Sequence, residues 1–182
     1  MVINTHLHAD HCGGNTRYEV TGELVPTFPQ ATYCLQRMEL ADALFPNERT
    51  AATYRKENVQ PLLESGLVRM LSGDARLTNQ VRVIIARGHT RAHQCVVLES
   101  EGQKALVLGD LASWPIHIER LAWIPAYDVE PLETLETRRR LAEWAVEEEV
   151  LLIFEHHPDI QAGYLRRADR PGRYCLEPVD LH

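Results

Sequence analysis

The segment from His6 to His11 constrains this chain more than any other feature of its sequence. It places three histidines and one aspartate within six residues, at His6, His8, Asp10 and His11. Imidazole and carboxylate groups are the ligands that suit Zn²⁺, Fe²⁺ or Mn²⁺. We therefore expect the core of a metal site here, rather than a polar strand end whose histidines are exposed by accident.

The spacing of these four residues predicts how they divide between two ions. In an extended segment, positions two apart point the same way, so His6 and His8 can hold one ion together. If the chain then turns, Asp10 and His11 face a second position beside the first. Two consecutive glycines follow the segment, as such a tight turn would need.

The remaining sequence predicts a mixed α and β protein without internal repeats or low-complexity segments. We expect strands at residues 2–5, 32–35, 67–71, 81–86, 95–98, 105–108 and 150–154, with a further edge strand at 172–176. Residues 16–31 are expected to form an irregular loop or a hairpin, and helices are expected at about 37–45, 48–63 and 131–149.

The last of these helices has a predicted apolar face and a charged one. The apolar face comprises Leu132, Leu135, Ala142, Trp144, Ala145 and Val146. The run Arg138-Arg139-Arg140 is interpreted as a solvated face, with Glu143 and Glu147 as partners one turn along.

Further candidate ligands follow predicted strands, just past their carboxyl ends. They are His89 after strand 81–86, Asp110 after strand 105–108, and the run Glu155-His156-His157 after strand 150–154. Loops held at strand ends are where functional groups usually lie on a rigid scaffold. A single histidine after a strand is more often structural than a ligand, so it is the recurrence at four strand ends, His6 included, that indicates a site.

Charge and composition exclude several kinds of partner. The formal net charge of −7 argues against nucleic acid or an anionic membrane surface as the main partner. It is compatible with a small-molecule substrate. No apolar run approaches the roughly 20 residues that span a bilayer, and the first residues contain no signal-peptide core. The four cysteines form no C-x-x-C pair, which is typical of reduced thiols in a cytoplasmic protein.

The order and spacing of the motifs resemble the metallo-β-lactamase superfamily over essentially the whole chain. The motifs are His6-x-His8-x-Asp10-His11-x-Gly13-Gly14, Gly88-His89-Thr90-x-x-His93, Gly109-Asp110 and Glu155-His156. Within the superfamily the chain looks like the N-acyl homoserine lactonase and methyl parathion hydrolase branch. Weaker similarity to that branch lies at Phe28-Pro29, Gly109-Asp110-Leu111 and Tyr127-Asp128.

This resemblance implies an α+β fold, the αββα sandwich, with two divalent metal ions, zinc or alternatively Fe²⁺ or Mn²⁺. Carried over by position, His6, His8 and His89 would hold one ion, Asp10, His11 and His156 the other, and Asp110 would bridge both. Such a dinuclear site lowers the pKa of a bridging water toward about 7, so that hydroxide attacks an ester or lactone. Asp10 would be the catalytic proton acceptor.

The sequence departs from the family in four places. Ala92 and Arg91 replace a usual glycine and a common proline. Lactonases of this branch often have a tyrosine shortly after the bridging aspartate, where this chain has Leu111-Ala112-Ser113-Trp114. Family members also carry several strands before the first motif. We therefore expect one hydrolase domain over residues 1–182, shortened at its N-terminus with the first strands and any leader missing, and able to form a homodimer.

Several neighbouring residues have competing interpretations. His93 is expected to hydrogen bond beside the site without binding metal, and His156 is preferred to His157 as the last ligand. Cys12 is interpreted as a buried thiol rather than a soft ligand, and His117 as core or pocket lining. The aromatic residues Trp114, Trp123 and Tyr127 either wall a substrate pocket or belong to the core.

Three functions remain open. The first is cleavage of a small ester or lactone, and the second is a phosphotriesterase or thioesterase activity of the same superfamily. A glutathione thioesterase would need a basic C-terminal region, which Arg166-Arg167-Ala168-Asp169-Arg170 matches poorly. The third is a truncated, non-catalytic metal-binding remnant.

Overall fold

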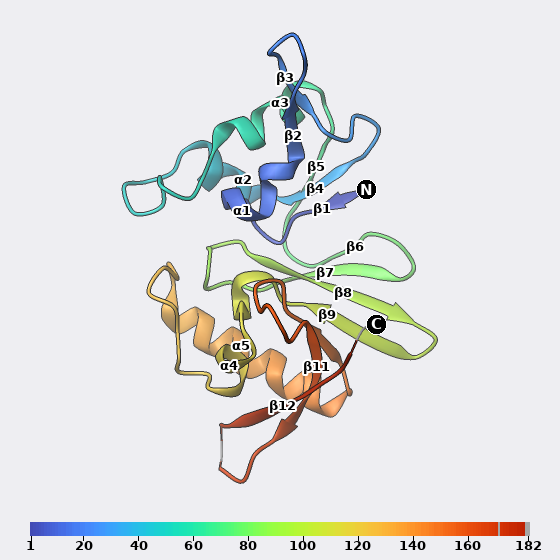
Figure 1. Ribbon diagram of the computed structural model, residues 1–182, viewed down its shortest axis with the longest axis vertical. Helices are drawn as coiled ribbons and strands as arrows, with labels where there is room; N and C mark the ends of the chain where they lie inside the picture. The colour runs from blue at the N-terminus through green and yellow to red at the C-terminus, as the bar shows by residue number, and fades with distance from the viewer. Residues whose placement is uncertain (171, 181–182) are drawn as a thin grey trace. The chain divides into compact units, whose positions relative to one another are not determined.

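The computed structural model describes residues 1–170 and 172–180, which form two compact units, Met1–Gly73 and a second that begins at Asp74 (Figure 1). Among these described residues, no helix is both long and apolar enough to cross a membrane. The four cysteines are free thiols, as predicted, and only Cys175 is exposed.

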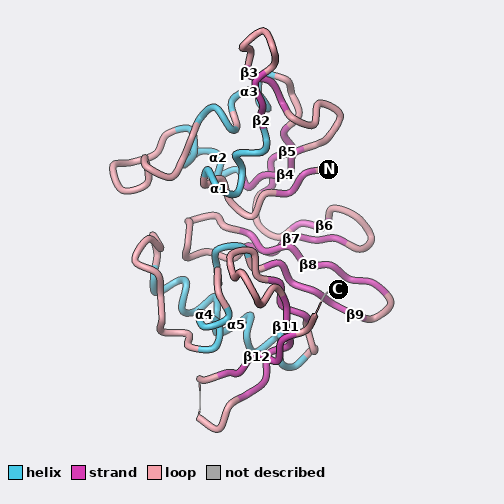
Figure 2. Tube along the Cα trace, viewed as in Figure 1, coloured by secondary structure: helices cyan, strands magenta, loops and turns pink. Residues whose placement is uncertain are grey.

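The first unit contains a parallel sheet with the strand order β1-β4-β5. Its strands are β1 (Val2–Ile3), β4 (Tyr33–Gln36) and β5 (Val68–Leu71), and a separate hairpin pairs β2 (Thr16–Tyr18) with β3 (Leu24–Pro26). Its helices are α1 (Ala9–Cys12), α2 (Arg37–Leu44) and α3 (Gln60–Glu64), with 3₁₀ turns η1 (Gly13–Asn15) and η2 (Lys56–Asn58). Loops make up much of the rest (Figure 2).

Most predicted elements of this unit are confirmed, but the helix predicted for residues 48–63 is wrong. That region holds only turns, η2 and the short α3. The Asn47 side chain accepts hydrogen bonds from the backbone N–H groups of Arg49 and Thr50, so a side-chain turn competes with the helix. Pro61 has no N–H to donate, and it therefore stands in the first turn of α3.

The second unit is built on a seven-stranded sheet with the order β12-β11-β10-β9-β8-β7-β6. Its strands are β6 (Ala75–Arg76), β7 (Val81–Ile85), β8 (Gln94–Ser100), β9 (Gln103–Val107), β10 (Leu151–Ile153), β11 (Ala162–Arg167) and β12 (Tyr174–Pro178). Helices α4 (Pro115–Glu119) and α5 (Pro131–Glu147) and the 3₁₀ turn η3 (Gly109–Ala112) complete it.

The strand directions in this sheet bring three loops to one edge. β8 is antiparallel to both β7 and β9, so β7 and β9 run the same way. β9 and β10 are parallel. The carboxyl ends of β7, β9 and β10 therefore lie at the same edge of the sheet.

The two strands predicted at 95–98 and 105–108 are β8 and β9, which form a hairpin that turns through two residues in the left-handed region, Glu101 with φ 50° and Gly102 with φ 79°. Two successive positive φ values match the right-handed twist of the paired strands. Strand β11 has no counterpart among the predicted elements. Gly163 within it is required by packing, since an added Cβ would lie 2.6 Å from the Glu177 carbonyl oxygen.

Helix α5 covers one face of this sheet, where Leu141, Ala142 and Ala145 pack with buried residues of β8, β9 and β10. Two predictions for this helix are wrong. Leu132 is 76% exposed, and Arg138 is fully buried rather than solvated. Arg138 Nε donates to the Leu111 carbonyl and Nη1 donates to the Trp123 carbonyl over 2.9 Å. Helical periodicity could not predict this burial, because both acceptors of the guanidinium are backbone carbonyls outside the helix.

Candidate metal centre

The first unit presents His6, His8, Asp10 and His11 at the end of β1. Leu7 points into the core, while the rings of the flanking His6 and His8 lie 4.5 Å apart. The structure thus has the predicted alternation along an extended segment. The chain then enters α1, which brings the His11 ring to 4.2 Å from that of His6 and places His11 Nε2 3.5 Å from Asp10 Oδ2.

The turn after His8 does not depend on the two glycines. Helix α1 makes it, with the His8 carbonyl accepting from the N–H groups of His11 and Cys12, each over 3.0 Å. Gly13 has φ −59°, and neither glycine has a positive φ. An added Cβ on Gly13 or Gly14 would meet nothing within 4 Å.

Glu39 supports this cluster through hydrogen bonds, and no sequence motif points to this role. Its buried Oε1 accepts from the Leu7 N–H over 3.0 Å and from the Tyr54 hydroxyl over 2.9 Å. The Tyr54 ring in turn packs edge-on against His8, with centroids 4.9 Å apart. One carboxylate therefore fixes the backbone between His6 and His8 as well as the ring that contacts His8.

Cys12 has the contacts of a structural thiol. Its Sγ donates to the Leu7 carbonyl over 3.3 Å, and burial raises the pKa of the thiol to about 11. Since only the thiolate is a good metal ligand, these contacts support the interpretation as a buried thiol.

The second unit presents His89, Asp110 and His156, each just past one of the three co-directional strands. Asp110 lies between the two imidazoles: Oδ2 is 3.3 Å from His89 Nε2, and Oδ1 is 3.0 Å from His156 Nε2. Asp110 and His89 are buried, whereas His156 is partly exposed. The predicted convergence of strand-end residues is therefore present within this unit.

The orientation of the His89 ring is set by Asp128. Asp128 Oδ1 accepts from His89 Nδ1 over 2.9 Å, and Asp128 Oδ2 accepts from the Thr134 hydroxyl over 2.8 Å. This contact favours the tautomer with the proton on Nδ1, in which Nε2 presents a lone pair to Asp110. Sequence reasoning missed this role, because Asp128 and Thr134 have no fixed spacing to His89.

Gly88 allows helix α5 to approach this loop. A Cβ added at Gly88 would lie 2.3 Å from Thr134 Oγ1, and Gly88 has φ +137°. The Gly88 and His89 carbonyls accept from the N–H groups of Glu130 and Val129. The segment that leads into α5 is therefore hydrogen-bonded directly to the loop that carries His89.

The neighbours His156 and His157 have different contacts. His157 Nδ1 accepts hydrogen bonds from the Asp159 N–H over 3.2 Å and from the Ile160 N–H over 2.9 Å. The His157 side chain therefore stabilises the loop in which it lies. His156 instead faces Asp110. These contacts support the preference for His156 as a ligand.

The remaining candidates surround the second cluster. His93 is buried, with its ring 6.1 Å from that of His89. Burial and the nearby Arg138 lower the pKa of His117, which favours the neutral imidazole. Trp114, Trp123 and Tyr127 are 47%, 62% and 52% exposed, so their interpretation as core residues is wrong.

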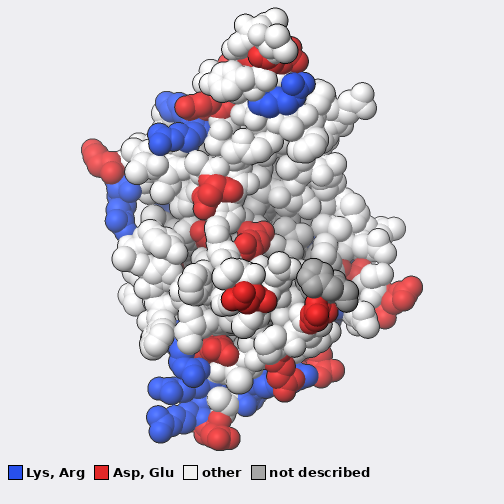
Figure 3. Space-filling model, viewed as in Figure 1, with Lys and Arg blue, Asp and Glu red and all other residues white. Residues whose placement is uncertain are grey.

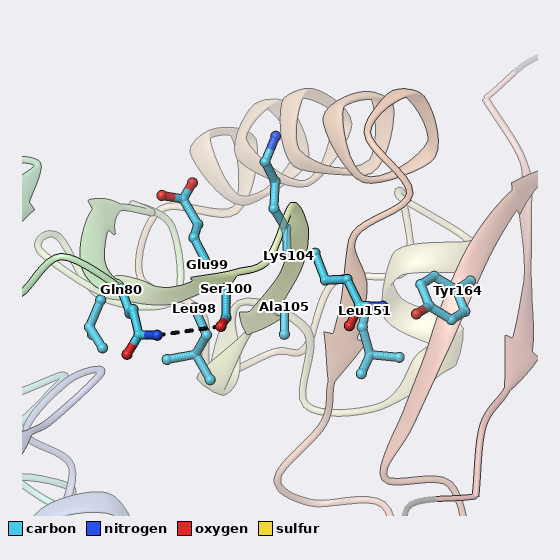
Figure 4. A pocket seen from close by; sticks show the side chains of 10 residues that line it. Gln80, Leu98, Glu99, Ser100, Lys104, Ala105, Leu151 and Tyr164 are labelled. Carbon is cyan, nitrogen blue, oxygen red and sulfur yellow. Dashed lines mark hydrogen bonds between the residues drawn. The ribbon is translucent and has the colours of Figure 1, made fainter.

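A hollow of about 400 Å³ in the second unit is separate from these ligands (Figure 4). It lies on one row of the sheet, in which Val81, Leu98, Ala105, Leu151 and Tyr164 are successive cross-strand partners. Gln80 and Ser100 hydrogen bond at its edge over 3.3 Å. Its lining contains no histidine or aspartate, so it is not a candidate metal site.

The donor atoms of the second cluster fit a bound cation. In the tautomer with the proton on Nδ1, His89 Nε2 and the carboxylate of Asp110 are both acceptors, and they lie 3.3 Å apart. Two acceptors at this distance repel unless a proton or a metal ion lies between them. Histidine and aspartate are also common ligands of divalent transition metals. The first cluster offers the same ligand types, and the residues of both belong to groups able to hold an ion.

Comparisons with known proteins agree with this chemistry. The metallo-beta-lactamase superfamily model matches residues 2–170. The N-acyl homoserine lactonase AttM of Rhizobium radiobacter is 27% identical in an alignment of 172 positions that covers 90% of this chain and 60% of that protein. The chain thus spans about three fifths of that relative's length.

Two solved structures are similar in fold. A probable metal-dependent hydrolase from Staphylococcus aureus superposes with a TM-score of 0.82 at 23% identity, covering 99% of this chain and 63% of that one. An N-acyl homoserine lactone hydrolase with the product N-hexanoyl-L-homoserine at its catalytic metal centre has a TM-score of 0.66 at 27% identity. That match covers 85% of this chain and 54% of the hydrolase.

Proposed function

Because the chain belongs to the metallo-β-lactamase superfamily, with the predicted fold confirmed, we propose that it is a metal-dependent hydrolase of small esters or lactones. The observation that carries this proposal is the convergence of two imidazoles on one carboxylate, with His89 Nε2 and His156 Nε2 at 3.3 and 3.0 Å from the Asp110 oxygens. The similarity to lactonases favours a lactone among the substrates of this class.

The two clusters would together hold two divalent ions, with zinc as the proposed metal. By their positions in the family's motifs, His6, His8 and His89 would bind the first, and Asp10, His11 and His156 the second, with Asp110 shared. When bound, the ions would lower the pKa of a water molecule and polarise the carbonyl under attack. The ligand types alone accept Fe²⁺ or Mn²⁺ as well.

The residues of the chain then have distinct tasks. Asp10, whose side chain is 62% exposed and next to His11, accepts the proton of the attacking water. A bond forms between the water oxygen and the carbonyl carbon, the carbon–oxygen bond to the alcohol breaks, and Asp10 returns its proton to the departing alkoxide. Asp128 keeps the His89 proton on Nδ1 throughout. The products are a carboxylic acid and an alcohol.

A thioesterase acting on glutathione thioesters would need a basic site near Arg166 and Arg167 of β11, and these residues do not provide one. Arg166 lies 2.8 Å from Glu177 and Arg167 lies 3.4 Å from Glu147, so both guanidinium groups are paired with carboxylates. The visible face of the molecule carries both basic and acidic side chains at its lower end (Figure 3).

The test is a metal measurement combined with a substrate screen. Purified protein should contain two divalent ions per chain by mass spectrometry, and should hydrolyse lactones or aryl esters faster than phosphotriesters or thioesters. Chelation should abolish turnover, and adding zinc should restore it. Full activity without metal would contradict the mechanism, and retained metal without any activity would favour the non-catalytic remnant. The single domain, cytoplasmic location and homodimer stay predictions.

A further inference from the structure

Helix α1 carries two candidate ligands, Asp10 and His11, on only four residues. A helix of this length is not stable by itself, and the carbonyl groups of its last turn have no partner within the helix. The His11 carbonyl instead accepts a hydrogen bond from the side-chain Nδ2 of Asn4 over 3.1 Å. Asn4 has no task in the proposed reaction, yet its amide fixes the end of the helix that carries both ligands.

The Asn4 side chain is oriented by a second asparagine. Asn15 Nδ2 donates to Asn4 Oδ1 over 3.0 Å, and both side chains are buried. A backbone carbonyl only accepts hydrogen bonds, so the Asn4 NH₂ group must face His11. Its oxygen then faces Asn15, which supplies the matching donor. The two contacts together allow one orientation of the Asn4 amide.

Asn15 is in turn anchored to the core of the first unit. Its carbonyl accepts from the Tyr33 hydroxyl over 3.2 Å and from the Thr27 N–H over 2.9 Å. Tyr33 is fully buried in β4, and its hydroxyl accepts from the Phe28 N–H over 3.1 Å. A continuous series of hydrogen bonds therefore runs from the parallel sheet to the end of α1.

Two buried side chains thus hold different parts of the first cluster. Glu39 holds the Leu7 N–H, which lies between His6 and His8, whereas Asn4 holds the carbonyl of His11. The support of the extended segment is separate from the support of the helix that follows it. Each of the two proposed ions takes its ligands in this cluster from one of these parts.

We propose that Asn4, oriented by Asn15, is a positioning residue for Asp10 and His11 and therefore for the ion that these two ligands would bind. This inference rests on the proposed metal-dependent function. Without the Asn4 amide, α1 loses the contact that fixes its end, and both ligands move with it. The ion held by His6 and His8 keeps its supporting contact through Glu39.

The test is a chelator titration of zinc-loaded protein, in which the wild type should release its two ions in two steps. Asn4→Ala should weaken one step by about tenfold, at the lower end of the usual cost of losing a contact behind a metal ligand, and leave the other unchanged. In His8→Ala the unchanged step should be the one affected. The matched control is Asn58→Ala, which removes a different amide contact with α1, from Nδ2 to Cys12 Sγ over 3.6 Å, and should change neither step.

The selectivity of the loss decides between positioning and general stabilisation. Equal weakening of both steps in Asn4→Ala, or no weakening, would overturn the assignment. If Asn4→Ala does not fold, Asn15→Ala decides instead, because it keeps the Asn4 donor but releases its orientation. It should weaken the same step by a smaller factor, and an unchanged step would overturn the proposal.

The same samples separate this inference from the proposed function. A wild type that shows two zinc steps and the selective Asn4 effect, but hydrolyses no ester or lactone, would support the role of Asn4 and overturn the proposed hydrolysis. A wild type that holds no zinc would overturn both.

Discussion

The two ligand clusters of this protein are built in opposite ways. In the first unit, four candidate ligands come from one segment, and their relative positions follow from a short strand and the first turn of α1. In the second unit, three candidate ligands come from three strand ends, and they converge because β7, β9 and β10 run in the same direction. A contiguous cluster is defined by local backbone geometry, whereas a dispersed cluster is defined by the topology of a sheet.

Their supporting carboxylates differ in the same way. Glu39 holds the backbone of the first cluster at the Leu7 N–H, while Asp128 holds an imidazole of the second directly. A change at Glu39 should therefore disturb the position of the backbone between His6 and His8. A change at Asp128 should disturb the tautomer and orientation of the His89 imidazole. This difference can be tested by substitution.

The largest expected effects come from the first cluster. Asp10→Asn should lower kcat by about 10²- to 10⁴-fold while metal is retained, because the amide cannot accept the proton of the attacking water. His8→Ala should instead reduce metal content. Mass spectrometry and steady-state kinetics on the same samples distinguish the two outcomes, and a normal kcat for Asp10→Asn would remove this residue from the mechanism.

The second cluster should depend sharply on which of two adjacent histidines is removed. His156→Ala should cost metal and activity, because its Nε2 faces Asp110. His157→Ala should affect mainly its loop, where Nδ1 accepts two backbone N–H groups. Zinc titration of both variants measures this contrast, and greater damage from His157→Ala would shift the assignment by one residue.

The two supporting carboxylates provide the next comparison. Asp128→Asn should weaken zinc binding by about 10- to 100-fold, because a carboxamide is a poorer acceptor for His89 Nδ1–H. Glu39→Gln should have a smaller effect, since the amide oxygen can still accept from the Leu7 N–H. Competition with a chelator gives both affinities. Equal losses would mean that backbone position matters as much as ligand orientation.

The smallest effect should be on the stability of the second unit. Arg138→Met keeps the buried stem but leaves the Leu111 and Trp123 carbonyls without their donor, which should cost about 1–3 kcal/mol of unfolding free energy. Arg139→Met, at an exposed position on the same helix, is the matched control and should leave the urea midpoint unchanged. Similar midpoints for the two variants would show that the buried guanidinium contributes little.

The sequence alone determined the first cluster, most strands and the family. The alternation of His6, Leu7 and His8 is a property of any extended segment, so its geometry could be deduced before the fold was known. The resemblance that rested on these motifs is confirmed by the family match over residues 2–170. Apolar runs such as 81–86 identified strands because burial on both faces selects β-branched residues.

Only the tertiary structure decided how the second cluster is supported. Asp128, Thr134 and Gly88 meet through packing of α5 against the His89 loop, and no spacing rule links them. The same holds for Arg138, whose acceptors lie on two other segments. Local periodicity indicates which side of an element faces the core. The position of a buried polar group depends instead on partners that are distant in sequence. These partners come together only when the chain folds.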